Sequence, residues 1–301
     1  MKIATTTADF AAYTSSQTEA MEYIRQAGFK YIDYNFGNDY RTKTGIFGNE
    51  PERHIESVLK KADELGVKLV QSHSQMGTPL ADEDGSFLRD TAKCVEACAA
   101  MGIPNVVVHS GYLYNISRED CFERNKRFFM PLVEIGEKLN VDILVENFNK
   151  MIVPNVFWID NANDLLEMIE YVDHPRFQAV WDVGHANMLD TPQDEALRLL
   201  GKHARALHIQ DNMGNELEDS HIAPFFGTLN LDSLMHGLLD IGYDGYFTFE
   251  SCSILLSGDK RRKYDADKRL LTAPLSLRIK AEEFLYETGK TILEAYGCFE
   301  E

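Results

Sequence analysis

The sequence has no long apolar run. No stretch approaches the roughly 18 consecutive apolar residues that mark a membrane-spanning helix, so a membrane protein is not expected. The first residues, Met1–Thr5, enter a strand-like run directly. They lack the charged, apolar and small-residue zones of a secretory signal peptide.

Cysteine is also scarce. The chain has 5 cysteines, an odd number, and no C-x-x-C pair. A disulfide framework is therefore not expected, and we predict a reduced, cytoplasmic protein.

Basic residues are outnumbered, with 30 Lys and Arg against 48 Asp and Glu and a net charge of −18. Broad contact with nucleic-acid phosphates draws its affinity from clustered Lys and Arg, so nucleic acid is not the expected partner. A small-molecule substrate fits better. One local exception is the basic segment from Lys260 to Arg269, which we interpret first as a solvated loop and second as a clamp for a phosphorylated or acidic sugar.

No G-x-G-x-x-G follows the first strand-like run, so a dinucleotide-binding fold is not favoured. What is present is a regular alternation of short, nearly continuous apolar runs with longer amphipathic segments, which is typical of βαβ units. The predicted strands are Lys2–Thr7, Tyr31–Phe36, Lys68–His73, Asn105–Ser110, Asp142–Asn147, Phe177–Val183, Ala206–Asp211 and Tyr246–Ser251. Eight such units predict an α/β protein of the (β/α)8 TIM-barrel class, with residues 1–301 as one domain; an open doubly wound sheet is the alternative.

Helix signals support this alternation. Ser16 to Glu19 form a capping-box pattern at the start of the first helix, and Gly28 suits its end. Gly66 and Gly102 suit the ends of the second and third helices. Later helices are predicted over Asp120–Leu139, Asn163–Tyr171, Pro192–Leu200, Leu231–Leu239 and Leu277–Ala295.

Ionisable residues stand near the ends of six predicted strands. They are His73, His109, Glu146, Asp182, His208 and Glu250. In such barrels catalytic groups lie at the C-terminal ends of the strands. A single histidine there is usually a hydrogen-bonded rim residue, but a carboxylate in an apolar strand is costly unless it is paired or bound to a metal.

Four successive strands carry Glu146, Asp182, His208 and Glu250. Three carboxylates and an imidazole suit one divalent ion (Mn²⁺, Mg²⁺, Co²⁺ or Zn²⁺), and the absence of cysteine ligands argues against a structural zinc. We therefore predict a metal site on these four residues. A salt-bridged rim without metal is the alternative.

These motifs resemble those of the xylose isomerase-like TIM barrel superfamily, in its sugar-phosphate isomerase/epimerase branch. The similarity is most specific over Trp181–Asn187, Leu207–Asn212 and Gly242–Glu250. The resemblance implies that Glu146, Asp182, His208 and Glu250 bind one metal ion, often manganese, and that Glu146 and Glu250 are also the catalytic acid/base pair. It implies a substrate contact at His185, and we expect further contacts from the residues around it. These are His73, His109, Asn147 and His221.

The predicted function is a metal-dependent isomerase or epimerase of a sugar or sugar phosphate, working by proton transfer through an enediolate. An inosose-type dehydratase uses related chemistry and is one alternative. A second is a multinuclear zinc hydrolase similar to the AP endonucleases, because Asp219 and His221 add ligands for further ions. A barrel kept only as a binding subunit is a third. Homo-oligomeric assembly is left open.

Overall fold

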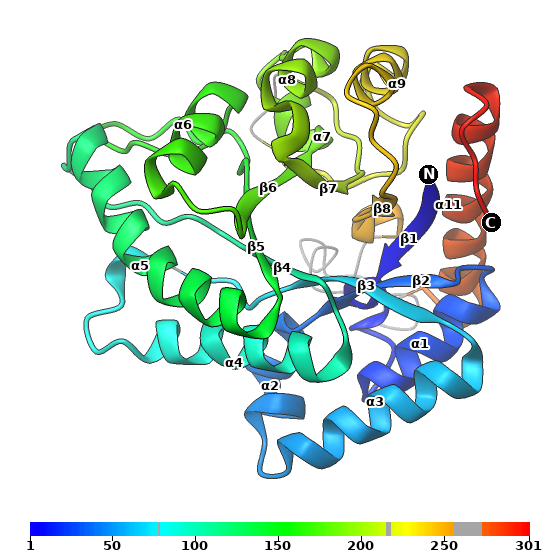
Figure 1. The fold of residues 1–301 in the computed structure, drawn as a ribbon. Coiled ribbons are helices and arrows are strands. Elements are labelled where there is room, and N and C mark those ends of the chain that lie inside the picture. The colour runs from blue at the N-terminus through cyan, green and yellow to red at the C-terminus, as the bar shows by residue number, and fades with distance from the viewer. Residues whose placement is uncertain (78, 215–217, 256–272) are drawn as a thin grey trace, which may run out of the picture.

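All eight predicted strands are present, and they lie side by side in one parallel sheet (Figure 1). The computed structural model describes residues 1–77, 79–214, 218–255 and 273–301. Its strands are β1 (Lys2–Thr6), β2 (Tyr31–Asn35), β3 (Lys68–His73), β4 (Asn105–Val108), β5 (Asp142–Glu146), β6 (Phe177–Asp182), β7 (Ala204–His208) and β8 (Tyr246–Phe249). The largest shift from prediction is in β7, which begins two residues earlier and ends at His208.

The sheet closes on itself between β7 and β8. Neighbouring strands pair in the order β7-β6-β5-β4-β3-β2-β1-β8. Ile209 N donates to Thr248 O at 2.8 Å, and Glu250 N donates to Ile209 O at 3.0 Å. Because this link joins the two end strands, the sheet is a barrel, as predicted, and the open doubly wound alternative is wrong.

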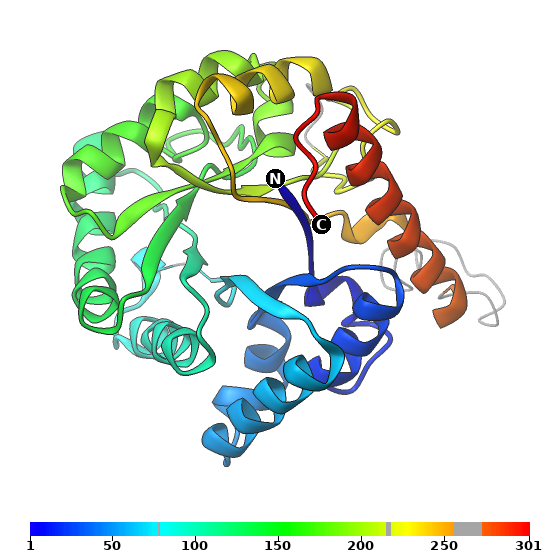
Figure 2. The ribbon, with the colours of Figure 1, turned by 45° about the vertical axis from the view of Figure 1, so that its right-hand side comes forward.

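Helices surround the strands as an outer layer (Figures 1 and 2). They are α1 (Gln17–Gln26), α2 (Gly37–Thr42), α3 (Pro51–Leu65), α4 (Ser86–Met101), α5 (Arg118–Leu139), α6 (Ala162–Val172), α7 (Val183–Asn187), α8 (Gln193–Leu200), α9 (Leu231–Asp240) and α11 (Leu275–Ala295). Short 3-10 helices lie at Thr7–Phe10, Gly45–Phe47, Pro79–Ala81, Gly201–His203 and Cys252–Ile254. The apolar faces of the α-helices and of the strands they cover form the main core.

The helix ends follow the sequence signals with one change. Ser16 accepts a hydrogen bond from Glu19 N, as the capping box predicts, but the Glu19 carboxylate accepts from Ser15 N rather than Ser16 N. Gly66 ends α3 in the left-handed conformation. The short helices α2 and α7 were not predicted, because five or six residues are too few to show a helical period.

The barrel interior is layered where the site residues lie. A small apolar cluster inside the ring consists of Val107, Leu144, Val180 and Ala206. Each member stands two residues before a predicted site residue, namely His109, Glu146, Asp182 and His208. Because side chains two apart on a strand face the same side, the strands that hold the apolar layer also present the ionisable groups above it.

Helix α11 is fastened to the barrel by a buried ion cluster. Arg278 Nη2 donates to Asp9 Oδ2 at 2.9 Å and also bonds Glu282, whose carboxylate accepts from Thr5 of β1. Arg278 Nη1 donates to the carbonyl of Cys252, just beyond β8. The two chain termini lie close together beside this helix (Figure 2).

Among the described residues, no helix is both long enough and apolar enough to cross a membrane. The basic segment from Lys260 to Arg269 lies outside the described residues.

The contact between α5 and β5 gives a stability prediction. A Cβ at Gly136 of α5 would lie 2.4 Å from the backbone oxygen of Val141, the residue before β5. The backbone of one of these two segments would therefore have to move. We expect Gly136→Ala to lower the free energy of unfolding by about 1–3 kcal/mol, the range for overpacking. Chemical denaturation measures this, with the exposed Lys138→Ala in the same helix as control. A Gly136→Ala variant as stable as the parent would contradict the packing described here.

Candidate metal centre

The four predicted ligands come together at the C-terminal ends of the strands. Glu146 and Asp182 end β5 and β6, His208 ends β7, and Glu250 follows β8 directly. One ligand atom from each of the four lies within 4.8 Å of the others. Glu146, Asp182 and His208 are buried, and Glu250 is half-buried. The arrangement has the size and the donors to hold one divalent metal ion.

The surroundings of two atoms, His208 Nδ1 and Asp182 Oδ2, describe this cluster best. His208 Nδ1 lies 3.1 Å from Glu146 Oε1 and 3.1 Å from Glu250 Oε2. Asp182 Oδ1 accepts from His185 N at 2.8 Å and from Gln210 Nε2 at 3.3 Å. The buried Oδ2 has no hydrogen-bond partner among the residues that the structure describes; His185 Nδ1, 3.5 Å away, already donates to a backbone carbonyl. A buried carboxylate oxygen without a partner is costly, and a cation would satisfy it.

The charges of the cluster are strongly coupled. Burial raises the pKa of Asp182 to about 7, and the neighbouring Glu146 and Glu250 add to this. Burial lowers the pKa of His208, but the carboxylates of Glu250 and Glu146 outweigh it and raise the value to about 10. Burial likewise raises the pKa of Glu146, but His208 and His109 hold it well below its usual range. The carboxylates thus favour positive charge at this position.

His73 and His109 flank Glu146 on the β3 and β4 side. His109 Nε2 lies 2.8 Å from Glu146 Oε2 and 3.1 Å from His73 Nε2. His73, Glu146 and His208 also place ligand atoms within 4.8 Å of one another, so Glu146 lies between two groups of possible metal ligands.

A further group lies on the β6 and β7 side. His185 in α7 and His221 in the loop after β7 both face Asp219. Their Nε2 atoms lie 3.1 Å and 2.9 Å from Asp219 Oδ2. Burial raises the pKa of the Asp219 carboxyl, but the two imidazoles outweigh this effect and hold the pKa well below its usual range. These three residues form another set that could hold a metal ion.

Three of the histidines are oriented in the same way. Nδ1 of His73, His185 and His221 each donates to a backbone carbonyl at 2.8 Å, those of Ser74, Asn147 and Glu250 respectively. Nδ1 thus carries a proton in each ring, and Nε2 points to the Asp219 carboxylate in His185 and His221 and to His109 in His73. This orientation is typical of histidines that bind metal, because the second nitrogen fixes the ring.

Asn147, predicted to contact substrate, has both ends of its amide occupied by Asp182. Nδ2 donates to Asp182 O at 2.9 Å, and Oδ1 accepts from Asp182 N at 2.8 Å. The side chain is fully buried. In this geometry Asn147 holds the backbone of Asp182 in place.

Two residues of the site were missed by the sequence reasoning. Gln210 bridges Asp182 and Asp219 through Nε2, and a Cβ at Gly184 would lie 2.1 Å from its side-chain carbon, so only glycine leaves it room. Asp33 in β2 is buried, and burial raises its pKa to about 6. Asp33 is a lone carboxylate in an apolar strand, so the criterion that identified Glu146 applies to it as well.

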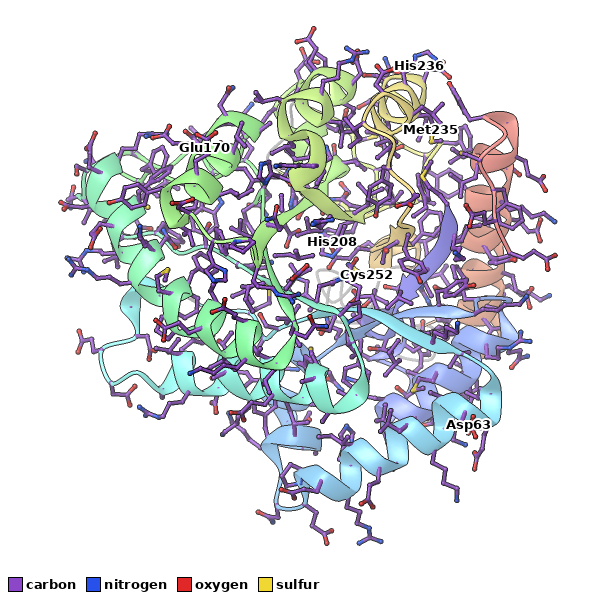
Figure 3. All side chains as sticks on the ribbon, viewed as in Figure 1. Asp63, Glu170, His208, Met235, His236 and Cys252 are labelled. Atoms are coloured by element: carbon purple, nitrogen blue, oxygen red, sulfur yellow. The ribbon has the colours of Figure 1, made fainter. Side chains whose placement is uncertain are left out.

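The remaining histidines lie elsewhere. His208 lies near the middle of the ring of strands in Figure 3, whereas His236 lies on the outer helix α9. His54 is in α3, and His174 and His203 precede β6 and β7 at the opposite rim.

The fold and these motifs agree with known proteins. The xylose isomerase-like TIM barrel family matches residues 21–273 of the chain, and the protein belongs to this family, as its strand-end motifs predicted.

Several similar proteins are carbohydrate epimerases by name. The fructoselysine 3-epimerase of Escherichia coli O157:H7 is 31% identical over 149 residues, which span 50% of this chain and 52% of the enzyme. The structure of a D-tagatose 3-epimerase-like protein covers 99% of this chain and 100% of its own, with a TM-score of 0.72 and 20% identity. L-ribulose 3-epimerase covers 97% of this chain and 94% of its own, with a TM-score of 0.75 and 18% identity. These structures share the fold with this chain.

The position of the Asp182 carboxylate in this cluster gives a prediction. Asp182→Asn keeps the shape of the side chain but removes its charge, and we expect metal affinity to fall at least about tenfold, as it does when the groups around a metal are altered. Elemental analysis after dialysis measures occupancy. Asp160→Asn, a half-buried carboxyl outside the four-residue cluster, is the control. Unchanged occupancy in Asp182→Asn would remove it from the ligand set.

Proposed function

We propose that the protein is a divalent-metal-dependent epimerase or isomerase of a sugar or sugar phosphate. It would move a proton at a carbon next to a carbonyl, through an enediolate. The observation that carries the proposal is the convergence of Glu146 and Glu250 on one imidazole nitrogen, at 3.1 Å each. Two carboxylates that reach one point from separate strands can remove a proton and return one.

Glu146 and Glu250 are the proposed acid and base. Return of the proton to the same carbon gives epimerisation, and return to the adjacent carbon gives isomerisation. Each group would contribute about 10²- to 10⁴-fold to the rate. Glu250 is less buried than Glu146, which leaves its carboxylate more open to solvent for proton exchange.

Glu146, Asp182, His208 and Glu250 are the proposed metal ligands. The donor set suits Mn²⁺, Zn²⁺, Co²⁺ or Mg²⁺. When bound, a divalent ion supplies Lewis acidity and stabilises negative charge on substrate oxygens.

Around these ligands, His73, His109, His185 and His221 are the proposed substrate contacts. Their Nδ1 protons fix the rings of His73, His185 and His221, and a substrate oxygen that bonds Nε2 would replace the present contact with His109 or Asp219. For Asn147 we propose an indirect role: it orients Asp182, because both ends of its amide already bond the backbone of that residue and the side chain is fully buried.

The proposed substrate class rests on chemistry and on relatives. A small polyhydroxy carbonyl compound suits an acidic protein with a net charge of −18. Fructoselysine 3-epimerase and L-ribulose 3-epimerase, by their names, act on such compounds. Buried thiols at Cys94, Cys98 and Cys121 suit a reducing compartment, and we extend the proposal to the cytoplasm.

A single substitution tests the acid/base assignment. Glu146→Gln should lower turnover by at least about 10²-fold, because the amide cannot exchange a proton. The assay uses a panel of ketoses, pentoses, inososes and their phosphates in the presence of Mn²⁺. Removal of the metal with a chelator should abolish the activity of the parent. Metal content and the unfolding transition are measured in parallel, so that loss of the ion or of the fold is recognised.

Glu170→Gln is the matched control, since Glu170 lies on the outer helix α6 (Figure 3). Turnover close to that of the parent in Glu146→Gln would refute the acid/base role.

A second candidate function has its own observation. The group of His185, Asp219 and His221 could hold an ion besides the four-residue centre. The group of His73, Glu146 and His208 is a third possible set, which shares Glu146 and His208 with that centre. A multinuclear zinc hydrolase of phosphodiesters would use such a set. The acidic charge of the chain argues against a nucleic-acid substrate.

Metal stoichiometry separates the two candidates. We expect one tightly bound ion per chain after dialysis and no cleavage of duplex DNA that contains an abasic site. In this case His221→Gln should leave the metal count unchanged while raising KM for the sugar. Three ions per chain together with strand cleavage would replace the epimerase by the hydrolase.

A further inference from the structure

A row of aromatic rings leads outward from the candidate metal centre. Phe148, which follows β5, packs against His109 with 4.5 Å between ring centroids and against His185 with 5.4 Å. Trp158 lies 4.9 Å from Phe148, and Tyr112 lies 4.4 Å from Trp158.

The row ends at the surface. Tyr112 lies 6.0 Å from Tyr114, which is 59% exposed. The row therefore connects two histidines of the site to solvent.

The two loops that carry these rings are joined to each other. Asn115 N, after β4, donates to Asn155 O, after β5, at 2.8 Å, and Tyr114 and Val156 form an isolated antiparallel bridge. Phe148 N donates to Ile159 O at 3.1 Å. The rings are thus held on a paired backbone, which limits the entropy lost when a ligand stacks on them.

The loops that follow the strands also carry exposed apolar side chains. Among the described residues, the six most exposed large apolar side chains, at 51–68%, all follow the C-terminal ends of strands; those on helices reach only 40–48%. The six are Met76, Tyr114, Ile152, Met213, Phe225 and Phe226. Apolar side chains gathered at one opening indicate a binding surface.

We propose that Tyr112, Tyr114 and Trp158 form a subsite for an aryl or other apolar substituent carried by the sugar. The substrate would then be a conjugated sugar rather than a free monosaccharide. This rests on the proposed function, because the subsite continues the sugar site at His109 and His185. Aromatic rings suit such a group. Trp158 Nε1, buried and without a hydrogen-bond partner among the described residues, could bond an oxygen that joins the substituent to the sugar.

Binding of matched glycosides tests the subsite without any turnover. The probes are phenyl and methyl glycosides of D-glucose and D-galactose, which differ only in the substituent, titrated by calorimetry and by tryptophan emission. The chain has 2 tryptophans, and Trp181 is fully buried, so an emission change reports Trp158.

We expect the phenyl compounds to bind about tenfold more tightly than the methyl compounds. Tyr114→Ala should reduce that ratio at least about twofold, the lower value of one aromatic contact, and should leave methyl-glycoside affinity unchanged. Tyr171→Ala, another exposed tyrosine but on α6, is the control and should keep the ratio.

Equal affinity for phenyl and methyl compounds, or a ratio that Tyr114→Ala does not change, would overturn the proposal. So would dissociation of a dimer by Tyr114→Ala with the ratio unchanged, because the exposed rim would then be a contact between two copies of the chain. A chain that prefers phenyl glycosides but turns over no sugar keeps the subsite and loses the epimerase. A chain that epimerises free sugars without preferring phenyl glycosides keeps the epimerase and loses the subsite.

Discussion

The arrangement of the surrounding structure depends on three buried or half-buried carboxylates at one end of the barrel, those of Glu146, Asp182 and Glu250. Glu146 and Asp182 are 1% and 0% exposed, and Glu250 completes the set at His208. Burying such charges costs several kcal/mol each unless positive charge and hydrogen bonds compensate. The histidines around them offset part of this cost. Compensation is incomplete at Asp182 Oδ2, which accepts no hydrogen bond from the described part of the chain.

The backbone that carries one site residue orients another. The carbonyl of Asn147, next to Glu146, accepts the Nδ1 proton of His185, and the carbonyl of Glu250 itself accepts that of His221. The side chain of Asn147 then fixes the backbone of Asp182. Strands β5, β6 and β8 are therefore coupled through the site as well as through the sheet. A shift of any one of them would misplace a ligand and an imidazole together.

The barrel and its four central site residues could be predicted because both depend on short-range patterns. Apolar strands at regular spacing, each ending in one ionisable residue, determine which side chains face the mouth. The pairing of Asp219 with His185 and His221 depends on the path of the loop after β7, where no repeating pattern operates. The aromatic row could not be predicted for the same reason. Tyr112 and Trp158 are brought together by the contact between two loops, and the sequence of neither loop alone indicates that contact. Asp33 could have been predicted by the reasoning that identified Glu146, because both are carboxylates in apolar strands.

The apolar layer under the site connects the fold to the chemistry. Val107, Leu144, Val180 and Ala206 are at most 3% exposed and lie two residues before His109, Glu146, Asp182 and His208. They exclude water from below, so charges above them interact in a medium of lower effective dielectric than water. In such a medium the same carboxylates would attract a cation more strongly, and the proposed proton transfer would need less solvent reorganisation. Because side chains alternate along a strand, a register shift of one residue would turn both layers outward together. The packing of the barrel and the electrostatics of its mouth are thus set by one alternation.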